Sequence, residues 1–288
     1  MALADTAMAN PAALPSLVPV PQVIVTRPER EALQWVQALQ ARGIAAEALP
    51  LIAIGPPPDL QALQAARARV QALHYRALMF VSGNAAQHFL DPNTALALAS
   101  QAPAAIKTRA WSPGPGTAQT LCALSVPAHL IDRPAHDAVQ FDSESLWAQV
   151  QGQITPGDRV LVVRGTETGA AAQDGTGRAW LAQQLQAAGA QAEFVVAYTR
   201  GAPVFTAEQQ ALVHAAVAHG ALWLLSSSQA LAHLCAALPQ QDWARARALA
   251  THPRIAQAAH AAGFGAVHEC RPALDDVSAA IASIESLA

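Results

Sequence analysis

The chain has 288 residues, of which 52% are hydrophobic and 13% are charged, and its formal net charge at pH 7 is −3. The length suggests two domains of roughly 100–200 residues each, and the composition excludes a disordered chain. The small negative charge gives no reason to expect nucleic acid or an anionic membrane as a partner.

The first 22 residues, MALADTAMANPAALPSLVPVPQ, have no basic residue before their apolar positions and are repeatedly interrupted by proline. This pattern predicts a disordered N-terminal arm at 1–22 and not a secretory signal. No apolar run approaches the ~20 residues of a membrane-spanning helix, so we expect a soluble, cytoplasmic protein.

A strand followed by a helix is predicted directly after the arm. The run VIVTRPEREALQWVQALQARG from Val23 has a short β-branched stretch ending at Arg27, then Pro28 with two early glutamates, then apolar residues at helical spacing. Proline and acidic residues are typical of a first helical turn, and Gly43 is a typical helix stop.

The next predicted strand, ALMFVS from Ala77, runs into Ser82 and an alanine-rich helix. Further on, SPGPGTAQTL at 112–121 lacks the Gly-Lys-Ser/Thr ending of a P-loop and the third glycine of a dinucleotide fingerprint. We therefore expect a helix-opening turn in which the N–H groups around Gly116 and the hydroxyl of Thr117 form a general anion site.

The second half of the chain repeats these patterns. VLVVRG from Val160 repeats the first strand and its arginine, here Arg164, and ALWLLSSSQALAHLC from Ala221 repeats the second strand, so that Ser227 matches Ser82 and His233 matches His88. ATHPRIAQA from Ala250 repeats the turn and carries Arg254. The pattern predicts an internal duplication and an α/β fold of two doubly wound, parallel-sheet domains.

In such sheets the loops after the carboxyl ends of the strands carry the ligand. The candidate residues at those ends are Arg27, Ser82, Gly116, Thr117, Arg164, Ser227 and Arg254. Two further segments, Leu49–Pro58 and Tyr198–Pro203, are β-prone and then broken by proline or glycine, which predicts interdomain linkers.

Cysteine and histidine spacing gives no sign of a metal site. Cys122, Cys235 and Cys270 are far apart with no CxxC pair, and the ten histidines form no HExxH or other paired-ligand spacing. We expect free, buried thiols in a reducing compartment and no bound metal.

Six motifs in order resemble the uroporphyrinogen-III synthase family. They are VTRP at 25–28, FVSGNA, the GxGTAxxL turn, RG…GRxxLxxxLxxxGAxxxxxxxYTR from Arg164 to Arg200, LLSSSQAL, and HPRIAxxAxxxGFxxV from His252. The resemblance covers nearly everything after residue 22. It implies a monomeric, cofactor-free enzyme that closes hydroxymethylbilane into uroporphyrinogen III, releasing water and inverting the last pyrrole ring through a spiro intermediate.

The resemblance also implies a domain arrangement. Residues 23–54 plus 201–288 would form one α/β domain, and residues 55–200 would form the other. The two domains would be joined by a two-stranded linker, with the substrate bound between them.

The substrate that the resemblance implies carries eight carboxylates, which suits a chain whose only lysine is Lys107, since arginine binds carboxylates in a bidentate manner. Arg27, Arg164, Arg200 and Arg254 are the candidate ligands, with structural ion pairs as the alternative for each. We expect Ser82 and Ser227 to be helix caps that also touch the ligand, because no His–Asp arrangement accompanies them.

Tyr198, in AYTR, matches the linker tyrosine of the family. A phenol there would be a proton donor to the departing hydroxyl. The alternative is that Tyr198 only packs the linker.

The chain departs from the family pattern at two places. The family often has threonine where this chain has Arg254 and Ile255, and an insertion-like stretch at 166–176 leaves any contact from Arg178 open.

Two other functions stay open. A non-catalytic two-domain ligand sensor would share the duplicated halves but lacks an export signal here. A sugar-nucleotide transferase would need a phosphate-binding glycine loop or an acidic metal motif, and neither is present.

Overall fold

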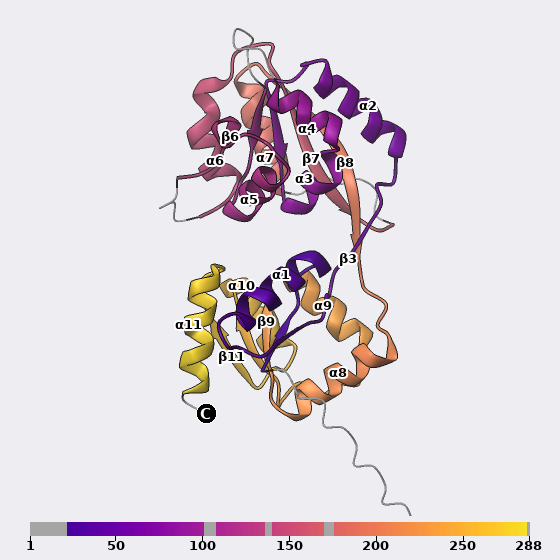
Figure 1. The fold of residues 1–288 in the computed structure, drawn as a ribbon, viewed down its shortest axis with the longest axis vertical. Coiled ribbons are helices and arrows are strands. Elements are labelled where there is room, and N and C mark those ends of the chain that lie inside the picture. The colour runs from indigo at the N-terminus through magenta and orange to yellow at the C-terminus, as the bar shows by residue number, and fades with distance from the viewer. Residues whose placement is uncertain (1–21, 101–107, 136–139, 170–175, 287–288) are drawn as a thin grey trace, which may run out of the picture. The chain divides into compact units, whose positions relative to one another are not determined.

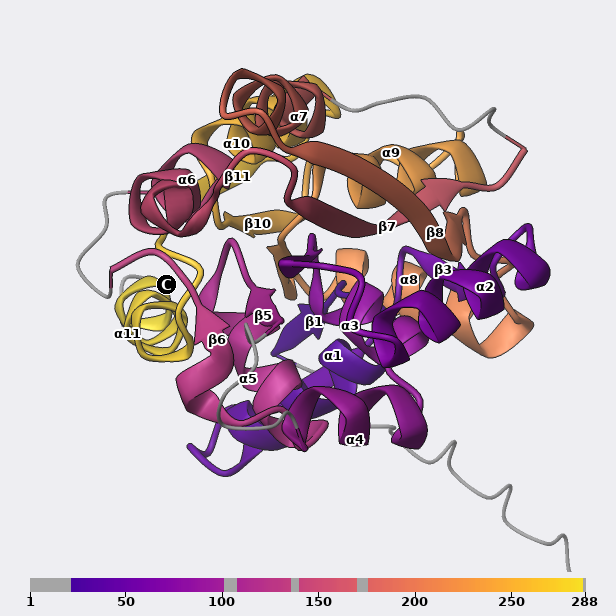
Figure 2. The same cartoon turned by 90° about the horizontal axis from the view of Figure 1, so that it is seen from above.

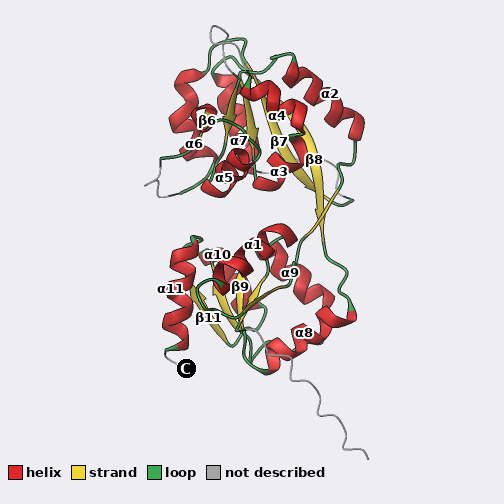
Figure 3. Cartoon of the chain, in the orientation of Figure 1, coloured by secondary structure: helices red, strands yellow, loops and turns green. Residues whose placement is uncertain are grey.

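The computed structural model describes residues 22–100, 108–135, 140–169 and 176–286 (Figure 1). The predicted N-terminal arm, Lys107 and most of the insertion-like loop lie outside these ranges. Strands and helices alternate along the chain (Figure 3). The chain divides into two compact units: unit 1 is the chain up to Ile52 together with the chain from Pro203 onward, and unit 2 is Ala53–Ala202.

Unit 1 is a five-stranded parallel sheet covered by helices on both faces. Its strands are β1 (Val23–Val25), β2 (Ala46–Ala48), β9 (Leu222–Leu225), β10 (Arg247–Ala250) and β11 (Ala266–Glu269), in the order β11-β10-β9-β1-β2. Its helices are α1 (Glu29–Gln40), α8 (Ala207–Ala218), α9 (Ser228–Ala237), α10 (Pro253–Ala261) and α11 (Leu274–Glu285). Helices α8, α9 and α10 pack against one face, and α1 and α11 pack against the other. This double cover explains why β1 and β9 are uninterrupted apolar runs, buried at every position.

Unit 2 is a six-stranded sheet. Its strands are β3 (Ala53–Gly55), β4 (Ala77–Phe80), β5 (Arg109–Trp111), β6 (Ile131–Asp132), β7 (Arg159–Glu167) and β8 (Gln191–Gly201), in the order β3-β8-β7-β4-β5-β6. Its helices are α2 (Leu60–Gln71), α3 (Gly83–Phe89), α4 (Pro92–Ala99), α5 (Pro115–Ala123), α6 (Ser143–Val150) and α7 (Thr176–Ala187), with short 3-10 turns at Ala128–Leu130 and Gln151–Gln153. Helices α2 to α5 cover one face, and α6 and α7 cover the other.

The strand β3 differs from the rest of its sheet. It pairs antiparallel with the end of β8, Ala53 opposite Gly201, whereas every other strand pair in the two sheets is parallel. The chain passes from unit 1 into β3 and leaves β8 for unit 1, so this two-stranded pair is the link between the units.

The two sheets have the same strand order when strands are matched as the sequence copies suggest. In unit 2 the order β6-β5-β4-β7-β8 corresponds, strand by strand, to β11-β10-β9-β1-β2 in unit 1. The chain visits these strands in a different sequence in the two units. This topology supports the internal duplication, which stays a prediction.

Several predicted helix boundaries are confirmed. Ser82 and Ser227 accept hydrogen bonds from the backbone N–H of Ala85 and Ala230, at 3.1 and 3.3 Å, and so cap α3 and α9. Gly43, the predicted stop of the first helix, follows α1 with φ +80, a left-handed backbone conformation that favours glycine.

The predicted end of the strand at Arg164 is wrong. β7 continues to Glu167 because β8 supplies a parallel partner as far as Arg200. For the same reason Tyr198 and Arg200 lie inside β8, and Arg200 also pairs with Ile54 in the two-stranded link.

None of the helices in the described ranges is long and apolar enough to span a membrane.

One close backbone approach in unit 1 generates a stability prediction. A Cβ atom at Gly265 would lie 1.9 Å from the carbonyl oxygen of Ala244, a backbone atom that cannot rotate away. Gly265→Ala is expected to lower the free energy of unfolding by about 1–3 kcal/mol, measured by urea denaturation. Gly152→Ala is the control, since a Cβ there meets nothing within 4 Å, and its unfolding free energy should stay within about 0.5 kcal/mol of the parent. Equal midpoints for the parent and Gly265→Ala would contradict the prediction.

Candidate active site

In unit 2 the strand order reverses between β4 and β7, so the chain continues to one side after β4 and to the other side after β7. Ligands of such sheets bind beyond the carboxyl ends of the strands at this position. Ser82 follows β4, and β7 passes through Gly165 there. In unit 1 the matching neighbours are β1 and β9, which are followed by Arg27 and Ser227.

Tyr198 lies at the reversal point of unit 2 with contacts on three sides. Its hydroxyl is 3.1 Å from the Oγ of Ser82, and its ring stacks on the imidazole of His88 with centroids 5.6 Å apart and planes 30° apart. Gly165 forms the third side, because a Cβ at that position would lie 2.4 Å from the Cζ of Tyr198. The phenol is therefore held in one place, with only 4% of the residue exposed.

A β-bulge explains how a strand residue reaches this position. Arg164 pairs with Val196, but Gly165 pairs with Tyr198, so the pairing skips Ala197. In a regular strand neighbouring side chains point to opposite faces of the sheet. Ala197 and Tyr198 are instead buried in the same core cluster, because the extra residue turns the strand.

Helix α3 presents Ser82 and His88 to the phenol and is held at both ends. Ser82 caps its first turn, and at its last turn the Nη2 and Nε of Arg67 donate to the carbonyls of His88 and Phe89 at 3.0 and 2.8 Å. Burial lowers the pKa of His88, which keeps the imidazole uncharged at neutral pH.

The predicted anion turn lies on the neighbouring strand's loop. Helix α5 begins after Gly114 with no side chain capping it, and Gly116 and Thr117 form its first turn. Helix α5 lies beside α3 (Figures 1 and 2), so closely that a Cβ at Gly83 would be 2.8 Å from the Oγ1 of Thr120. The corresponding turn in unit 1 is closed, because the Nδ1 of His252 accepts the N–H of Arg254 at 3.1 Å.

The candidate arginines differ in how far they are already engaged. Arg27 and Arg200 each have a carboxylate partner at 3.5 Å, Glu31 and Glu167 respectively. Those distances are longer than the ~2.7–2.9 Å of a strong charge-assisted hydrogen bond. Arginine pairs remote from the candidate site range from the 2.6 Å contact between Arg42 and Asp275 to the 4.0 Å contact between Arg76 and Asp158.

Two candidates differ from these loose pairs. Arg164 is 4% exposed, and its guanidinium lies 5.4 Å from the ring centroid of Phe194, so it belongs to the interior of unit 2. Arg254 is exposed on the first turn of α10, and within the described ranges no carboxylate forms an ion pair with it. The structure brings Ser82 and Tyr198 into contact and places the other predicted residues at the carboxyl ends of their own sheets, apart from buried Arg164.

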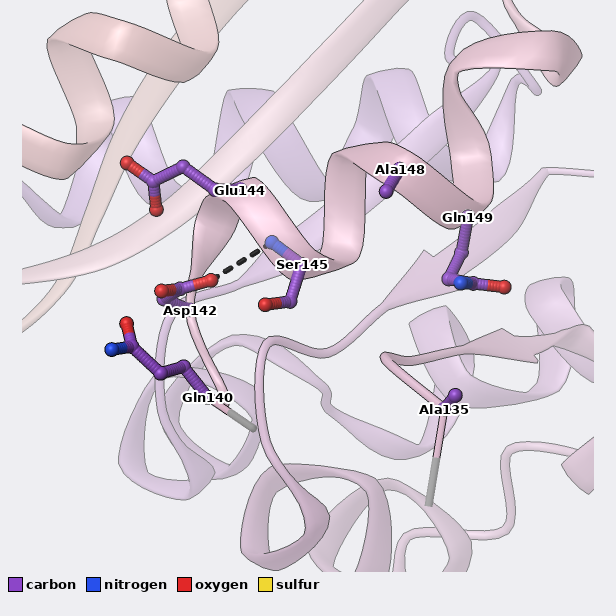
Figure 4. A pocket seen from close by; sticks show the side chains of 7 residues that line it. All are labelled: Ala135, Gln140, Asp142, Glu144, Ser145, Ala148 and Gln149. Atoms are coloured by element: carbon purple, nitrogen blue, oxygen red, sulfur yellow. Dashed lines mark hydrogen bonds between the residues drawn. The ribbon is translucent and has the colours of Figure 1, made fainter. Parts of the chain in front are cut away.

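A hollow of about 720 Å³ lies against α6 and the chain before it (Figure 4). Its lining includes Asp142 and Glu144 but no basic side chain. Asp142 caps α6 by accepting the N–H of Ser145 at 2.8 Å. These carboxylates make the hollow unsuitable for an acidic ligand.

The expectation of three buried thiols is wrong for Cys122, which is exposed on α5, whereas Cys235 and Cys270 are half-buried. Burial raises the pKa of Cys270 to about 11. In the part of the chain that the structure describes, no three His, Cys, Asp or Glu side chains gather in a way that could hold a metal ion.

Fold and site together define a two-unit, doubly wound α/β protein with polar residues at the carboxyl ends of the parallel strands of both sheets. A sequence model of the uroporphyrinogen-III synthase HemD family matches residues 34–277, and the chain belongs to this family.

Two solved structures illustrate the likeness. Uroporphyrinogen-III synthetase from Helicobacter pylori is 14% identical, with 93% of this chain and 100% of that chain covered and a TM-score of 0.54, which shows the shared fold. A mutant uroporphyrinogen III synthase from Thermus thermophilus is 15% identical, with 92% and 97% covered and a TM-score of 0.46.

Gly165 and His88 are functional candidates that the sequence patterns do not predict. A glycine inside a β-branched strand is a signal for a bulge or a close approach, and RG at the end of VLVV carries it. The stacking of His88 on Tyr198 joins segments far apart in the sequence and has no local signal.

The contact between Gly165 and Tyr198 generates a prediction. Gly165→Ala should destabilise the protein by about 1–3 kcal/mol, because the new methyl group collides with the ring. In a Tyr198→Ala background the same change should cost less than about 0.5 kcal/mol, since the ring is gone. The four free energies of unfolding form a double-mutant cycle, and a cost that is equal in both backgrounds would show that the ring does not depend on Gly165.

Proposed function

We propose that this chain is a lyase that cyclises hydroxymethylbilane to uroporphyrinogen III, in the biosynthesis of haem and other tetrapyrroles. The family match over residues 34–277 carries this conclusion. The substrate loses its terminal hydroxyl as water to give an azafulvene cation. Ring D then attacks through its substituted carbon, and the spiro intermediate rearranges and releases one proton, so that ring D is inverted in the product. The released proton balances the one that left with the hydroxyl as water.

In this proposal Tyr198 is the general acid. Departure of the hydroxyl requires a proton, and the phenol O–H is the proton source, held by Gly165 and Ser82. The buried ring fixes the position of that proton, which matters because the competing uncatalysed closure gives the uninverted isomer I.

Ser82 supports this role through its two hydrogen bonds. Its Oγ accepts the N–H of Ala85 as a helix cap, which leaves its own hydroxyl proton free to be donated to the phenol oxygen of Tyr198. Donation in that direction leaves the phenol proton for the substrate and stabilises the phenolate after transfer. The helix cap and the catalytic contact are then made by one hydroxyl.

The carboxylates of the substrate are the proposed ligands of the arginines and of the α5 turn. Gly116 and Thr117 offer backbone N–H groups at a helix start without a side-chain cap, while Arg27, Arg200 and Arg254 are loosely paired or unpaired with carboxylates in the described ranges. Ser227 offers the matching hydroxyl at the reversal point of unit 1. Buried Arg164 would contribute charge from beneath the site more than direct contact.

The two compact units are the proposed domains. Unit 1 would correspond to residues 23–54 plus 201–288 and unit 2 to 55–200, and we propose that the enzyme acts as a cytoplasmic monomer. The resemblance of the sequence to the family supports these assignments.

The activity is tested with enzymatically generated hydroxymethylbilane. The purified chain is expected to convert it to uroporphyrinogen III, separated from isomer I by chromatography after oxidation. Reactions without protein should give isomer I. Isomer I alone in the presence of folded protein would overturn the proposed function.

Tyr198→Phe separates catalysis from packing, because it keeps the ring and removes only the hydroxyl. We expect a folded variant whose rate falls at least about tenfold, the low end of the range for general acid catalysis since water can partly replace the phenol. The remaining enzymatic product should still be isomer III. A variant with parental melting temperature and full activity would reduce Tyr198 to a packing residue.

Arg254→Gln tests carboxylate binding. The side chain is exposed, so stability should be unchanged, while KM for hydroxymethylbilane should rise about tenfold for the loss of one charge-assisted hydrogen bond. Arg245→Gln is the matched control: Arg245 is also exposed but precedes β10, at the opposite end of the strand that Arg254 follows. Equal KM values for the two variants would remove Arg254 from the binding site.

A further inference from the structure

His88, on helix α3, has no role in the function proposed above. His88 is half-buried, and its ring lies against Tyr198 in an offset stack, within the ~4.5–7 Å centroid range of favourable aromatic pairs. Its backbone is fixed by Arg67 from α2, and the helix that carries it is capped by Ser82. This fixed backbone limits the positions that the imidazole can take beside the phenol.

The matching histidine of unit 1 has a related contact. His233 occupies the same place on α9 that His88 occupies on α3, six residues after the capping serine. Its Nδ1 is 2.9 Å from the carbonyl oxygen of Leu51, which directly precedes the residue where the chain leaves unit 1. Each histidine therefore contacts the segment through which the chain leaves its unit. Only the segment that His88 contacts carries a candidate proton donor, Tyr198.

We propose that His88 is a positioning residue for Tyr198: its ring, stacked on the phenol, holds the hydroxyl in the orientation from which it gives its proton to the substrate. This inference rests on the proposed function. Three groups then restrict the phenol in three ways. Gly165 leaves the space that the ring occupies, Ser82 orients the hydroxyl through a hydrogen bond, and His88 packs on the ring face and prevents its rotation.

The uncharged state of the imidazole is consistent with this role. Burial lowers the pKa of His88, so near pH 7 the phenol faces a flat neutral ring and not a cation that would favour its ionised form.

The test compares His88→Ala, which removes the ring, with His88→Phe, which keeps a flat ring. We expect kcat to fall about tenfold in His88→Ala with little change in KM, because misplacement of a catalytic group by about 1 Å can cost up to about 10²-fold. His88→Phe should retain kcat within about twofold. His233→Ala is the matched control, since it removes a brace of equal position in unit 1 and should leave kcat unchanged.

A second arm shows whether His88 acts through the phenol. In a Tyr198→Phe background, His88→Ala should cause no further loss of kcat, whereas general damage to unit 2 would lower the residual activity again. Additive losses, or equal losses in His88→Ala and His88→Phe, would overturn the proposal.

A third arm does not depend on activity. The chain has two tyrosines, Tyr75 and Tyr198, so ring-labelled tyrosine gives two sets of NMR signals that Tyr198→Phe assigns. His88→Ala should shift the ring signals of Tyr198 and leave those of Tyr75, which lies between Arg69 and Glu193, in place. An unmoved Tyr198 signal would overturn the stacking itself. If His88→Ala shifts the ring signals of Tyr198 as expected but the parent protein has no synthase activity, the proposed function is overturned and the stacking is not.

Discussion

The pairing of β7 with β8 is the constraint on which the site in unit 2 depends. Without the skipped residue at Ala197, the side chain of Tyr198 would point to the face covered by α6 and α7, away from Ser82 and His88. The glycine opposite the bulge then provides the space for the ring. The bulge between β7 and β8 thus places the candidate catalytic residue Tyr198 beside Ser82 and His88 of the α3 segment.

Arginine–carboxylate pairs in this protein cover a wide range of distances. The guanidinium of Arg247 lies 2.9 Å from Glu285, and Arg109 holds the edge strand β6 through Asp132, whereas Arg76 and Asp158 are 4.0 Å apart. The 3.5 Å pairs of Arg27 and Arg200 at the carboxyl ends of the sheets lie within this range. Exposed ion pairs contribute little to stability, so loosely held arginines cost the fold little while they wait for a carboxylate.

Much of the fold was predictable because its signals are local. Serine caps, glycine stops and apolar runs fix where α3, α9, β4 and β9 begin and end, and the repeat of those signals predicted two similar sheets. The short strand Ala46–Ala48 has no β-branched run, and the length of β7 depends on its partner β8. For the candidate site, the sequence was enough to predict which residues lie at strand ends. The packing of Gly165 and His88 around Tyr198 depends on tertiary structure and could not be predicted.

The strand order of unit 1 has a consequence for synthesis on the ribosome. The interior strand β1 is made long before its neighbour β9: the hydroxyl of Thr26 donates to the carbonyl of Leu224 across 198 residues. At ~5–20 residues per second this gap lasts about 10–40 s, during which all of unit 2 is made. Unit 2 can therefore finish folding while β1 still exposes an unpaired apolar edge, so this strand needs protection from association during that interval.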